Sequence, residues 1–400
     1  MTIFNSLGSN YAFSFVLKAL FTKNNPRFKQ ELEALLEKKY DGKVHLVYKG
    51  REALELAIRL LNLPKDSLVA VNGFTCFAVE KAIRNAGLKP LYVDINKDTL
   101  HFTEKELEKA FTKNPNIKVV IIQNTLGYPV AIEKIQVLCK KHNLILIEDL
   151  AHSVGAVYEN KKEAGTVGDF VMLSFSQDKM IDAVSGGALI IRNKTYQKSA
   201  IPEFFPMPKK QEMLDRFYPL FTFLIRSTYA IGFGKALHEL LKKINLLSKP
   251  VEQSYTDILH ALSPWYCSLV QEQFMKLSEN LSHRKSIVKI YSDMLSQSIT
   301  SVFVKEQRDF AANLRFPVFV ANRRDLIAFL KKQGVYVSDI WYDAPIAPKK
   351  LLAKTLYKND CPNGEFVSEH ILNLPTHRQV SESLAKRIAA LINQWQSQQK

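Results

Sequence analysis

The chain has 400 residues, which at about 150 residues per domain is enough for two lobes and appended segments. Hydrophobic residues make up 46 % and charged residues 24 % of the chain, and this globular balance excludes extended disorder. The net charge of +16 favours an anionic partner such as phosphate, nucleic acid or an acidic membrane face, but it does not choose among them.

The N-terminal segment, residues 1–29, is predicted to form an amphipathic arm. Its start, MTIFNSLGSNYAFSFVLKALF, contains an apolar patch but lacks the basic start, uninterrupted apolar stretch and small-residue cleavage site of a secretory signal. The cysteines are scattered, without CxxC pairs or metal-ligand spacing. We therefore expect a cytoplasmic protein with reduced thiols and no structural metal.

A large domain is predicted over residues 30–270, because short β-branched runs alternate with helix-period stretches from about residue 43 to residue 192. This βαβ rhythm is typical of a mostly parallel sheet flanked by helices. One unit begins with the strand NIKVVII and ends with the strand LILI at 144–147. The face of the helix between them is marked by Ile132, Ile135, Leu138 and Cys139.

Residues from about 200 to 250 break this rhythm and are predicted to be an insertion. Its part from about 217 to 247 indicates peripheral contact with the inner membrane face or with a lipid-carrying partner. FYPLFTFLIRSTYAIGF is interrupted by Pro219 and Arg226 and is shorter than the ~20 apolar residues of a spanning helix. The apolar face of KALHELLKKI is formed by Leu237, Leu240, Leu241 and Ile244. Packing on a partner subunit explains the same pattern equally well.

A smaller C-terminal α/β domain is predicted over residues 271–400. A long helical stretch at about 270–295 precedes it, and we place the boundary between the lobes there. The segments VFVKEQ, LRFPVFVA, DLIAFLKKQGVYVS and SLAKRIAALINQW then mix strand and helix patterns.

Ligands of open α/β sheets lie beyond the carboxyl ends of the strands, so polar residues that follow strands are candidates for a site. After the strand at 44–48, Gly50 begins a helix. A glycine at this turn allows the free N–H groups of the helix N-terminus to meet a phosphate. Many such turns need glycine for geometry alone, so this signal is weak by itself.

A second candidate follows the strand LILI, which brings Glu148 and Asp149 to its end, before the small Ala151 and His152. A carboxylate at this place can hold a protonated ring nitrogen through a charge-assisted hydrogen bond. A helix cap or an exposed acid explains the same segment equally well.

Lys179 is the third candidate, in a polar turn after the strand FVMLSF and before Gly186 and Gly187. A lysine that forms an imine must be partly neutral, which burial and nearby positive charge achieve by lowering its pKa. An isolated lysine in a loop is nearly always a solvated surface charge. Only the combination of the three strand ends favours an imine-forming site.

Together these segments resemble the DegT/DnrJ/StrS family of PLP-dependent sugar aminotransferases, which have the α/β architecture of fold-type I PLP-dependent transferases. EDLAHSVGA resembles the family's EDxAHxxGA segment, and GTVGDFVMLSFSQDK with SGGALI resembles its GxxGDxxxxSFxxxK with the downstream GGA. KGREALELAI is similar to the phosphate turn, and LNLPTHRQVSESLAKRIAALI to the C-terminal segment and last helix. The resemblance covers most of residues 30–195 and 255–395.

This resemblance implies a role for each matching residue. Lys179 would bind pyridoxal 5′-phosphate as an imine and then shuttle the substrate proton. Asp149 would pair with the ring nitrogen, Ala151 would pack on one face of the ring, and His152 would lie near the phenolic oxygen. The phosphate would be held by the N–H groups of Gly50, Arg51 and Glu52 and by the hydroxyl of Ser174.

Three segments depart from the family pattern. The position that usually stacks an aromatic ring on the cofactor is Cys76 in NGFTCFAVEKAI, with Phe74 and Phe77 as substitutes beside it. An Asn-Tyr-Arg segment that reaches the phosphate across the dimer is replaced by SPWYCS at 263–268. A histidine often found before the last substrate loop is missing from VSDIWYDAPIAP. We therefore expect changes in the stacking, in the dimer contact and in the substrate pocket.

The sequence thus predicts a homodimeric aminotransferase that moves an amino group from an amino acid, glutamate by resemblance, to a nucleotide-linked keto-sugar. The pathway would be surface polysaccharide or secondary-metabolite sugar biosynthesis. A second interpretation keeps the cofactor for elimination or dehydration, although Lys179 is retained where deoxygenating relatives have histidine. A third is a non-catalytic scaffold with the same fold. No nucleic-acid partner is predicted, because the basic residues are dispersed and no recognised module is visible.

Overall fold

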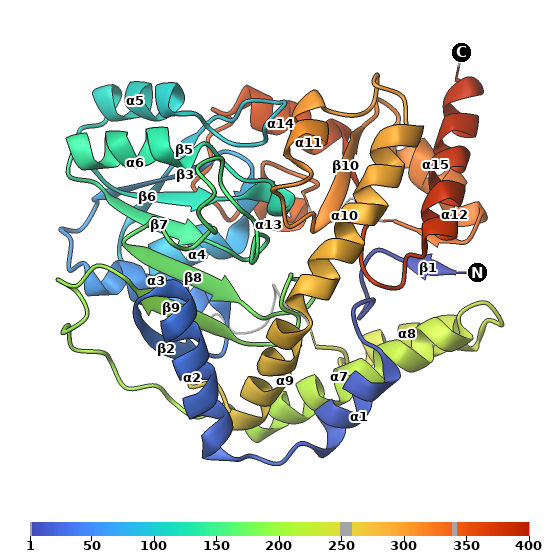
Figure 1. Cartoon of the computed structure of the whole chain (residues 1–400), viewed down its shortest axis with the longest axis horizontal. Helices are drawn as coiled ribbons and strands as arrows, with labels where there is room; N and C mark the ends of the chain where they lie inside the picture. The colour runs from blue at the N-terminus through green and yellow to red at the C-terminus, as the bar shows by residue number, and fades with distance from the viewer. Residues whose placement is uncertain (1, 249–257, 338–341, 400) are drawn as a thin grey trace.

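The computed structural model describes residues 2–248, 258–337 and 342–399 of the chain (Figure 1). Its main element is a seven-stranded sheet. In spatial order the strands are β2 (Lys43–Val47), β9 (Gly187–Ile191), β8 (Phe170–Ser174), β7 (Ile145–Asp149), β6 (Ile117–Gln123), β3 (Leu68–Asn72) and β5 (Lys89–Val93). β9 is antiparallel to both of its neighbours, and the other neighbouring strands are parallel. The predicted mostly parallel sheet is therefore confirmed.

Both faces of this sheet are buried, because successive strand residues point into different hydrophobic clusters. In β6, Val120 and Ile122 belong to one cluster, whereas Val119 and Ile121 belong to the other. The first cluster also contains residues of α2 (Pro26–Tyr40), α5 (Glu104–Lys113), α6 (Ile132–Lys141) and α9 (Pro264–Met275). The second contains residues of α3 (Gly50–Leu60) and α4 (Phe77–Asn85). Helices thus cover both faces, as a mostly parallel sheet requires.

The unit predicted from NIKVVII to LILI is confirmed as β6, α6 and β7. α6 buries the face that was predicted for it, formed by Ile132, Ile135, Leu138 and Cys139. Glu133 in its first turn and two lysines in its last turn fit the helix macrodipole, which favours acidic residues at the N-terminal end and basic residues at the C-terminal end.

A smaller unit has a hydrophobic core of its own. It contains the antiparallel strands β10 (Arg315–Phe319) and β13 (Ile371–Pro375) with α10 (Leu277–Met294), α12 (Arg323–Lys332) and α15 (Glu382–Ser397). Within α10, Leu277 belongs to the core of the large unit, and Ile287 and Tyr291 belong to the small one. The remaining short helices are η1 (Thr125–Gly127), α11 (Val302–Gln307), α13 (Lys349–Leu352) and α14 (Pro362–His370).

Two short parallel pairs join distant parts of the chain. β1 (Ile3–Phe4) pairs with β11 (Val335–Tyr336), and β4 (Thr75–Cys76) pairs with β12 (Ile346–Ala347). After β1 along the chain, α1 (Phe13–Phe21) packs on α7 (Lys209–Thr228). The N-terminal residues are therefore built into the folded structure, through strand pairing and through helix packing.

The insertion folds as two contacting helices, α7 and α8 (Phe233–Lys243), which lie near α1 at the bottom of Figure 1. The residues predicted to share one apolar face of α8 lie at helical spacing in the structure, but the large core covers only part of that face. Leu241 is buried and Leu237 partly buried against that core, whereas Leu240 and Ile244 are 53 % and 51 % exposed. The last residues of the predicted insertion, 249–250, lie outside the described residues. In the described ranges, no helix is both long and apolar enough to cross a bilayer.

Candidate active site

The predicted phosphate turn brings the start of α3 against the end of β8. Gly50 is the first residue of α3, and Ser174 is the last residue of β8. A Cβ on Gly50 would lie 2.7 Å from the Cβ of Ser174 and 3.1 Å from its hydroxyl oxygen, so only glycine permits this approach. A helix N-terminus beside a hydroxyl group is a suitable cradle for a phosphate.

The next two residues of α3 differ in what they offer to an anion. Arg51 is partly exposed at the second position of the helix. The N–H of Glu52 donates to the carbonyl oxygen of Lys49 at 3.0 Å, and its carboxylate accepts the N–H of His260 at 3.1 Å. Of the three N–H groups predicted to hold a phosphate, the N–H of Glu52 is therefore already hydrogen-bonded within the first turn of α3.

Asp149 ends β7 as a buried carboxylate that is 3 % exposed. One of its oxygens accepts the N–H of Ala151 at 2.9 Å. Burial raises the pKa of Asp149 to about 6, against the opposing effects of that N–H and of Lys179. A buried acid of this kind gains its charge most readily beside a cation, such as a protonated ring nitrogen.

The neighbouring acid, Glu148, has a structural role. It is fully buried, and its carboxylate accepts the hydroxyl of Tyr158 at 2.7 Å. It also accepts the N–H groups of Gly165, Val167 and Gly168 at 2.7, 2.8 and 2.5 Å. Of the two acids at this strand end, Asp149 is therefore the one available for chemistry.

Lys179 and His152 meet at the centre of the site, where the amine lies 3.1 Å from Nε2 of the imidazole. Nδ1 of His152 accepts the N–H of Leu126 at 3.3 Å, so the proton of a neutral ring lies on Nε2. The amine then accepts this proton in a hydrogen bond, which requires that it be neutral. Burial lowers the pKa of Lys179, and Arg315 acts in the same direction. The geometry therefore suits a nucleophilic amine.

Tyr342 is a member of the site that the sequence did not reveal. Its hydroxyl lies 3.4 Å from Nδ1 of His152 and accepts the side-chain N–H of Gln123 at 2.9 Å. It lies in the segment VSDIWYDAPIAP, where we noted only a missing histidine; residues 338–341 of this segment lie outside the described residues. Gln123 could have been found in the same way as Asp149, because it is a polar residue at the carboxyl end of a buried parallel strand.

The segment around Cys76 gives a mixed outcome for the predicted ring-stacking position. Cys76 is partly exposed, caps α4 by accepting the N–H of Ala78 at 3.5 Å, and is among the groups that act on the pKa of Lys179. Phe77 is buried in the core beside α3, and Phe74 packs on Tyr342 with ring centroids 4.5 Å apart. Cys76 therefore borders the site, whereas Phe77 belongs to the hydrophobic core beside α3.

A buried ion pair from the smaller unit adjoins Lys179. Arg315 of β10 lies 4.0 Å from a carboxylate oxygen of Asp178, and both residues are buried. Burial raises the pKa of Asp178 to about 7, while Arg315 opposes this rise. The sequence did not reveal this pair, because its partners lie in different units of the structure.

The segment SPWYCS makes contacts within its own chain. Tyr266 donates its hydroxyl to Asp215 of α7 at 2.8 Å, and Trp265 is fully buried. Asp215 also accepts the hydroxyls of Tyr48 at 2.7 Å and Ser248 at 2.6 Å. These bonds anchor α7 to the large unit beside the strand that leads to Gly50.

A model of the DegT/DnrJ/EryC1/StrS aminotransferase family matches residues 17–212 and 256–393. The Campylobacter jejuni UDP-4-amino-4,6-dideoxy-N-acetyl-beta-L-altrosamine transaminase is 27 % identical over 363 residues, which cover 88 % of this chain and 85 % of that protein. A Geobacillus stearothermophilus "pleiotropic regulatory protein" is 24 % identical over 340 residues, 83 % and 79 % of the two chains. A Streptococcus pneumoniae protein, provisionally named a sugar aminotransferase and solved in its PMP form, is similar with a TM-score of 0.73 at 20 % identity, over 98 % of each chain.

Proposed function

Since the chain belongs to the DegT/DnrJ/EryC1/StrS aminotransferase family, we propose that it transfers an amino group from glutamate to a keto-sugar carried on a nucleotide. The protein is a PLP-dependent aminotransferase. The name of the Campylobacter jejuni relative, a transaminase of a UDP-sugar, supports the class of the acceptor. We place the reaction in the biosynthesis of sugars for surface polysaccharides or secondary metabolites.

The residues of the site fit pyridoxal 5′-phosphate. We propose that Lys179 holds it covalently, that Asp149 pairs with its ring nitrogen, and that Ala151 packs on one face of the ring. The close approach of Gly50 to Ser174 supports a phosphate site there. When bound, this group supplies an electron sink for the carbon that exchanges its amino group.

The contact of the Lys179 amine with Nε2 of His152, which favours a neutral amine, is the observation that carries the proposal. A neutral amine can take a proton from the reacting carbon of the substrate and return it at the next step. His152 keeps this amine oriented through its Nε2–H. The Asp149 carboxylate keeps a proton on the ring nitrogen, because the buried pair of opposite charges is stabilised by a charge-assisted hydrogen bond.

Arg315 is our candidate for the carboxylate of the amino donor. The residue is 4 % exposed and acts on the pKa values of both Lys179 and His152, so it is a buried cation at the site. A guanidinium suits a carboxylate because it can donate two parallel hydrogen bonds. The guanidinium also donates to the carbonyl oxygens of Asn5 at 2.6 Å and Leu314 at 3.0 Å, so a bound carboxylate would compete with these bonds and with Asp178, 4.0 Å distant.

Replacing Tyr342 with phenylalanine is expected to lower the rate of amino transfer by about threefold to tenfold, since one hydrogen bond contributes roughly 0.5–1.5 kcal/mol. The Leu126 N–H would still hold the His152 tautomer, so the loss is partial. Rates and the pH titration of the cofactor absorbance should be compared with those of Tyr336→Phe, whose ring packs on Phe4. Unchanged rates and an unchanged titration in Tyr342→Phe would remove Tyr342 from the site.

Half-transamination tests the proposed function directly. The holoenzyme mixed with glutamate is expected to convert its cofactor absorbance to that of the pyridoxamine form. Mass spectrometry with a panel of nucleotide keto-sugars should then identify an aminated product. A dehydrated product would support elimination instead. Absence of conversion with every amino acid tested would support a non-catalytic scaffold.

The assembly and the location of the enzyme are further parts of the proposal. We propose a homodimer, which follows from the family resemblance, and light scattering of the holoenzyme measures its mass. The replacement of the family's Asn-Tyr-Arg segment by residues 263–268 predicts a changed contact across the dimer, and Tyr266 of this segment bonds to Asp215 of its own chain. We also propose a peripheral location at the inner membrane face, through residues 217–247.

A further inference from the structure

We infer that exposed apolar side chains of α1, α7 and α8 form a single surface that docks on an anionic lipid bilayer. This inference deepens the peripheral location proposed above, adds α1 to the contact, and does not depend on which reaction the enzyme catalyses. The docking face is defined by Phe13, Leu17, Phe21, Met213, Phe217, Leu224, Phe233, Leu240 and Ile244, all of which are exposed.

Exposed apolar side chains are concentrated on this part of the molecule. Among the described residues, ten of the 18 exposed large apolar side chains lie on α1, α7, α8, the turn between α7 and α8, and Ile244 directly after α8. Phe21 is 73 % exposed, Phe233 59 % and Ile231, in that turn, 80 %. On each helix the exposed positions recur at helical spacing and form a stripe. Large contiguous apolar patches on soluble proteins usually mark an interaction site.

The stripes lie on neighbouring helices. Arg216 of α7 donates to carbonyl oxygens in the last turn of α1, and the rings of Phe13 and Phe223 lie 5.5 Å apart. α8 approaches α7 at Gly234, where a Cβ would lie 2.1 Å from the carbonyl oxygen of Ile225. α7 is therefore a neighbour of both α1 and α8, which lie near it in Figure 1.

The charges of α7 and α8 favour lipid over a second copy of the chain. The exposed lysines of α7 and α8 are Lys209, Lys210, Lys235, Lys242 and Lys243, whereas the exposed acid on these two fully described helices is Glu239. Anionic headgroups would neutralise such lysines. A two-fold interface would bring two copies of this net positive surface together, which is unfavourable.

The helices of the docking face lie mostly outside the family match. That match stops at residue 212 and resumes at residue 256, so nearly all of α7 and the whole of α8 fall in the gap. No helix in the described ranges could cross a bilayer, so the helices would lie in the interface with their apolar stripes in the headgroup region.

Flotation of the full-chain holoenzyme tests the inference. We expect it to float with vesicles of phosphatidylcholine and phosphatidylglycerol at low salt, and to float much less with phosphatidylcholine alone or at high salt. The apolar variant is Phe233→Ser, Leu240→Ser and Ile244→Ser together. Its matched control, Val137→Ser, Met275→Ser and Leu356→Ser, changes exposed apolar residues elsewhere.

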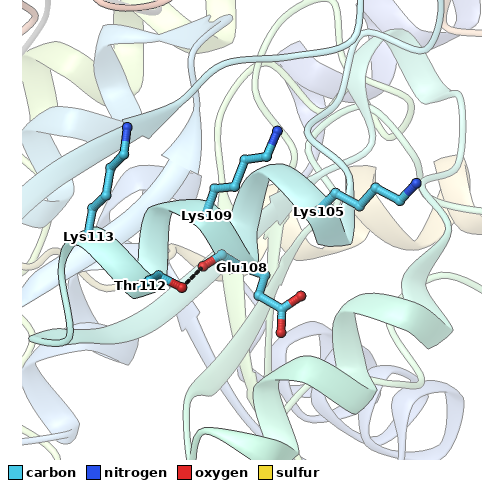
Figure 2. Close-up of a pocket in the computed structure, with 5 residues that line it drawn as sticks. All are labelled: Lys105, Glu108, Lys109, Thr112 and Lys113. Carbon is cyan, nitrogen blue, oxygen red and sulfur yellow. Dashed lines mark hydrogen bonds between the residues drawn. The ribbon is translucent and has the colours of Figure 1, made fainter.

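A lysine variant tests the electrostatic contribution to vesicle binding separately. It combines Lys235→Gln, Lys242→Gln and Lys243→Gln. The control combines Lys105→Gln, Lys109→Gln and Lys113→Gln on α5, where these lysines line a surface hollow that contains none of the site residues (Figure 2). Each α8 variant is expected to lower the affinity for anionic vesicles by about tenfold or more, and each control by less than about twofold.

The outcomes are distinct. Flotation of the wild type and both controls, with loss in both α8 variants, supports the docking face. Flotation of the α8 variants to the wild-type extent would overturn it. Absence of wild-type flotation would also overturn it, and a halved mass of the apolar variant in light scattering would then assign the face to subunit assembly. Half-transamination does not require vesicles, so a failure of docking is distinguishable from a failure of the proposed function.

Discussion

Replacing Lys179 with alanine is expected to lower the rate of amino transfer by at least about 10⁵-fold, which corresponds to about 7 kcal/mol of activation free energy. The reason is that one amine both holds the cofactor and moves the substrate proton, so one substitution removes two functions. Its position 3.1 Å from Nε2 of His152 favours the neutral, reactive form. Single-turnover rates of the wild type and Lys179→Ala, with absorbance spectra of both proteins, measure the effect.

Lys49 provides the matched control for this assignment. It is a buried lysine whose pKa burial lowers to about 8, and its amine donates to the hydroxyl of Ser185 at 2.8 Å. After borohydride reduction of the wild type, peptide mapping should find the pyridoxyl label on Lys179 and not on Lys49. Label on Lys49, or an unchanged cofactor spectrum in Lys179→Ala, would overturn the assignment.

The second large effect is expected for Asp149→Asn, which should slow half-transamination by several orders of magnitude, about 10⁴-fold or about 5 kcal/mol. A neutral amide cannot keep a proton on the ring nitrogen, so the cofactor loses its strength as an electron sink. Asp149→Glu should be almost as slow, because its longer side chain changes the reach. A near wild-type rate in Asp149→Asn would sink this assignment.

The same substitution is expected to stabilise the cofactor-free protein near neutral pH. Burial raises the pKa of Asp149 from 3.8 to about 6, so between these values the folded protein retains a proton that the unfolded chain has lost. The stability contributed by this proton therefore falls as the pH rises through that interval, and the loss is complete above it. Asparagine has no charge to desolvate, so the free energy of unfolding at neutral pH should rise by roughly 2–3 kcal/mol. Urea unfolding below and above this interval measures both effects.

Glu148→Gln is the matched control, because it changes the adjacent buried acid at the same strand end. Glutamine cannot accept all the N–H groups that the Glu148 carboxylate binds, so the free energy of unfolding should fall by about 1.5–3 kcal/mol. The rate of half-transamination should change by only a fewfold. A large loss of rate with unchanged stability would mean that Glu148, and not only Asp149, acts on the cofactor.

Local patterns in the sequence were sufficient to predict elements of the large unit and to single out candidate residues for the site. Strands that are buried on both faces appear in the sequence as continuous apolar runs. Helices that are buried on one face have apolar residues spaced three and four positions apart. These two patterns were enough to predict β6, α6 and β7. Gly50, Asp149 and Lys179 could be singled out because polar or small residues follow such strands at the ligand-binding edge of the sheet.

Other members of the site depended on the path of the whole chain. Tyr342 contacts His152 across 190 positions of sequence, and Arg315 comes to Asp178 from the core of a different unit. Neither contact leaves a periodic or spacing signal near either partner, because it is created only when the two units pack together. The sequence therefore left Tyr342 and Arg315 unmarked among ordinary tyrosines and arginines.

Tertiary packing also decided which way individual side chains face. Glu52 matched the phosphate turn by position, but His260 lies against its carboxylate and its N–H closes the first turn of α3. On α8 the sequence determined an amphipathic helix, and only the packing of α7 and the large core beside it decided that Leu241 is buried and Leu240 is exposed. The physical reason is that periodicity determines the directions in which the side chains of one element point. Which of these side chains is buried depends on where the neighbouring elements pack.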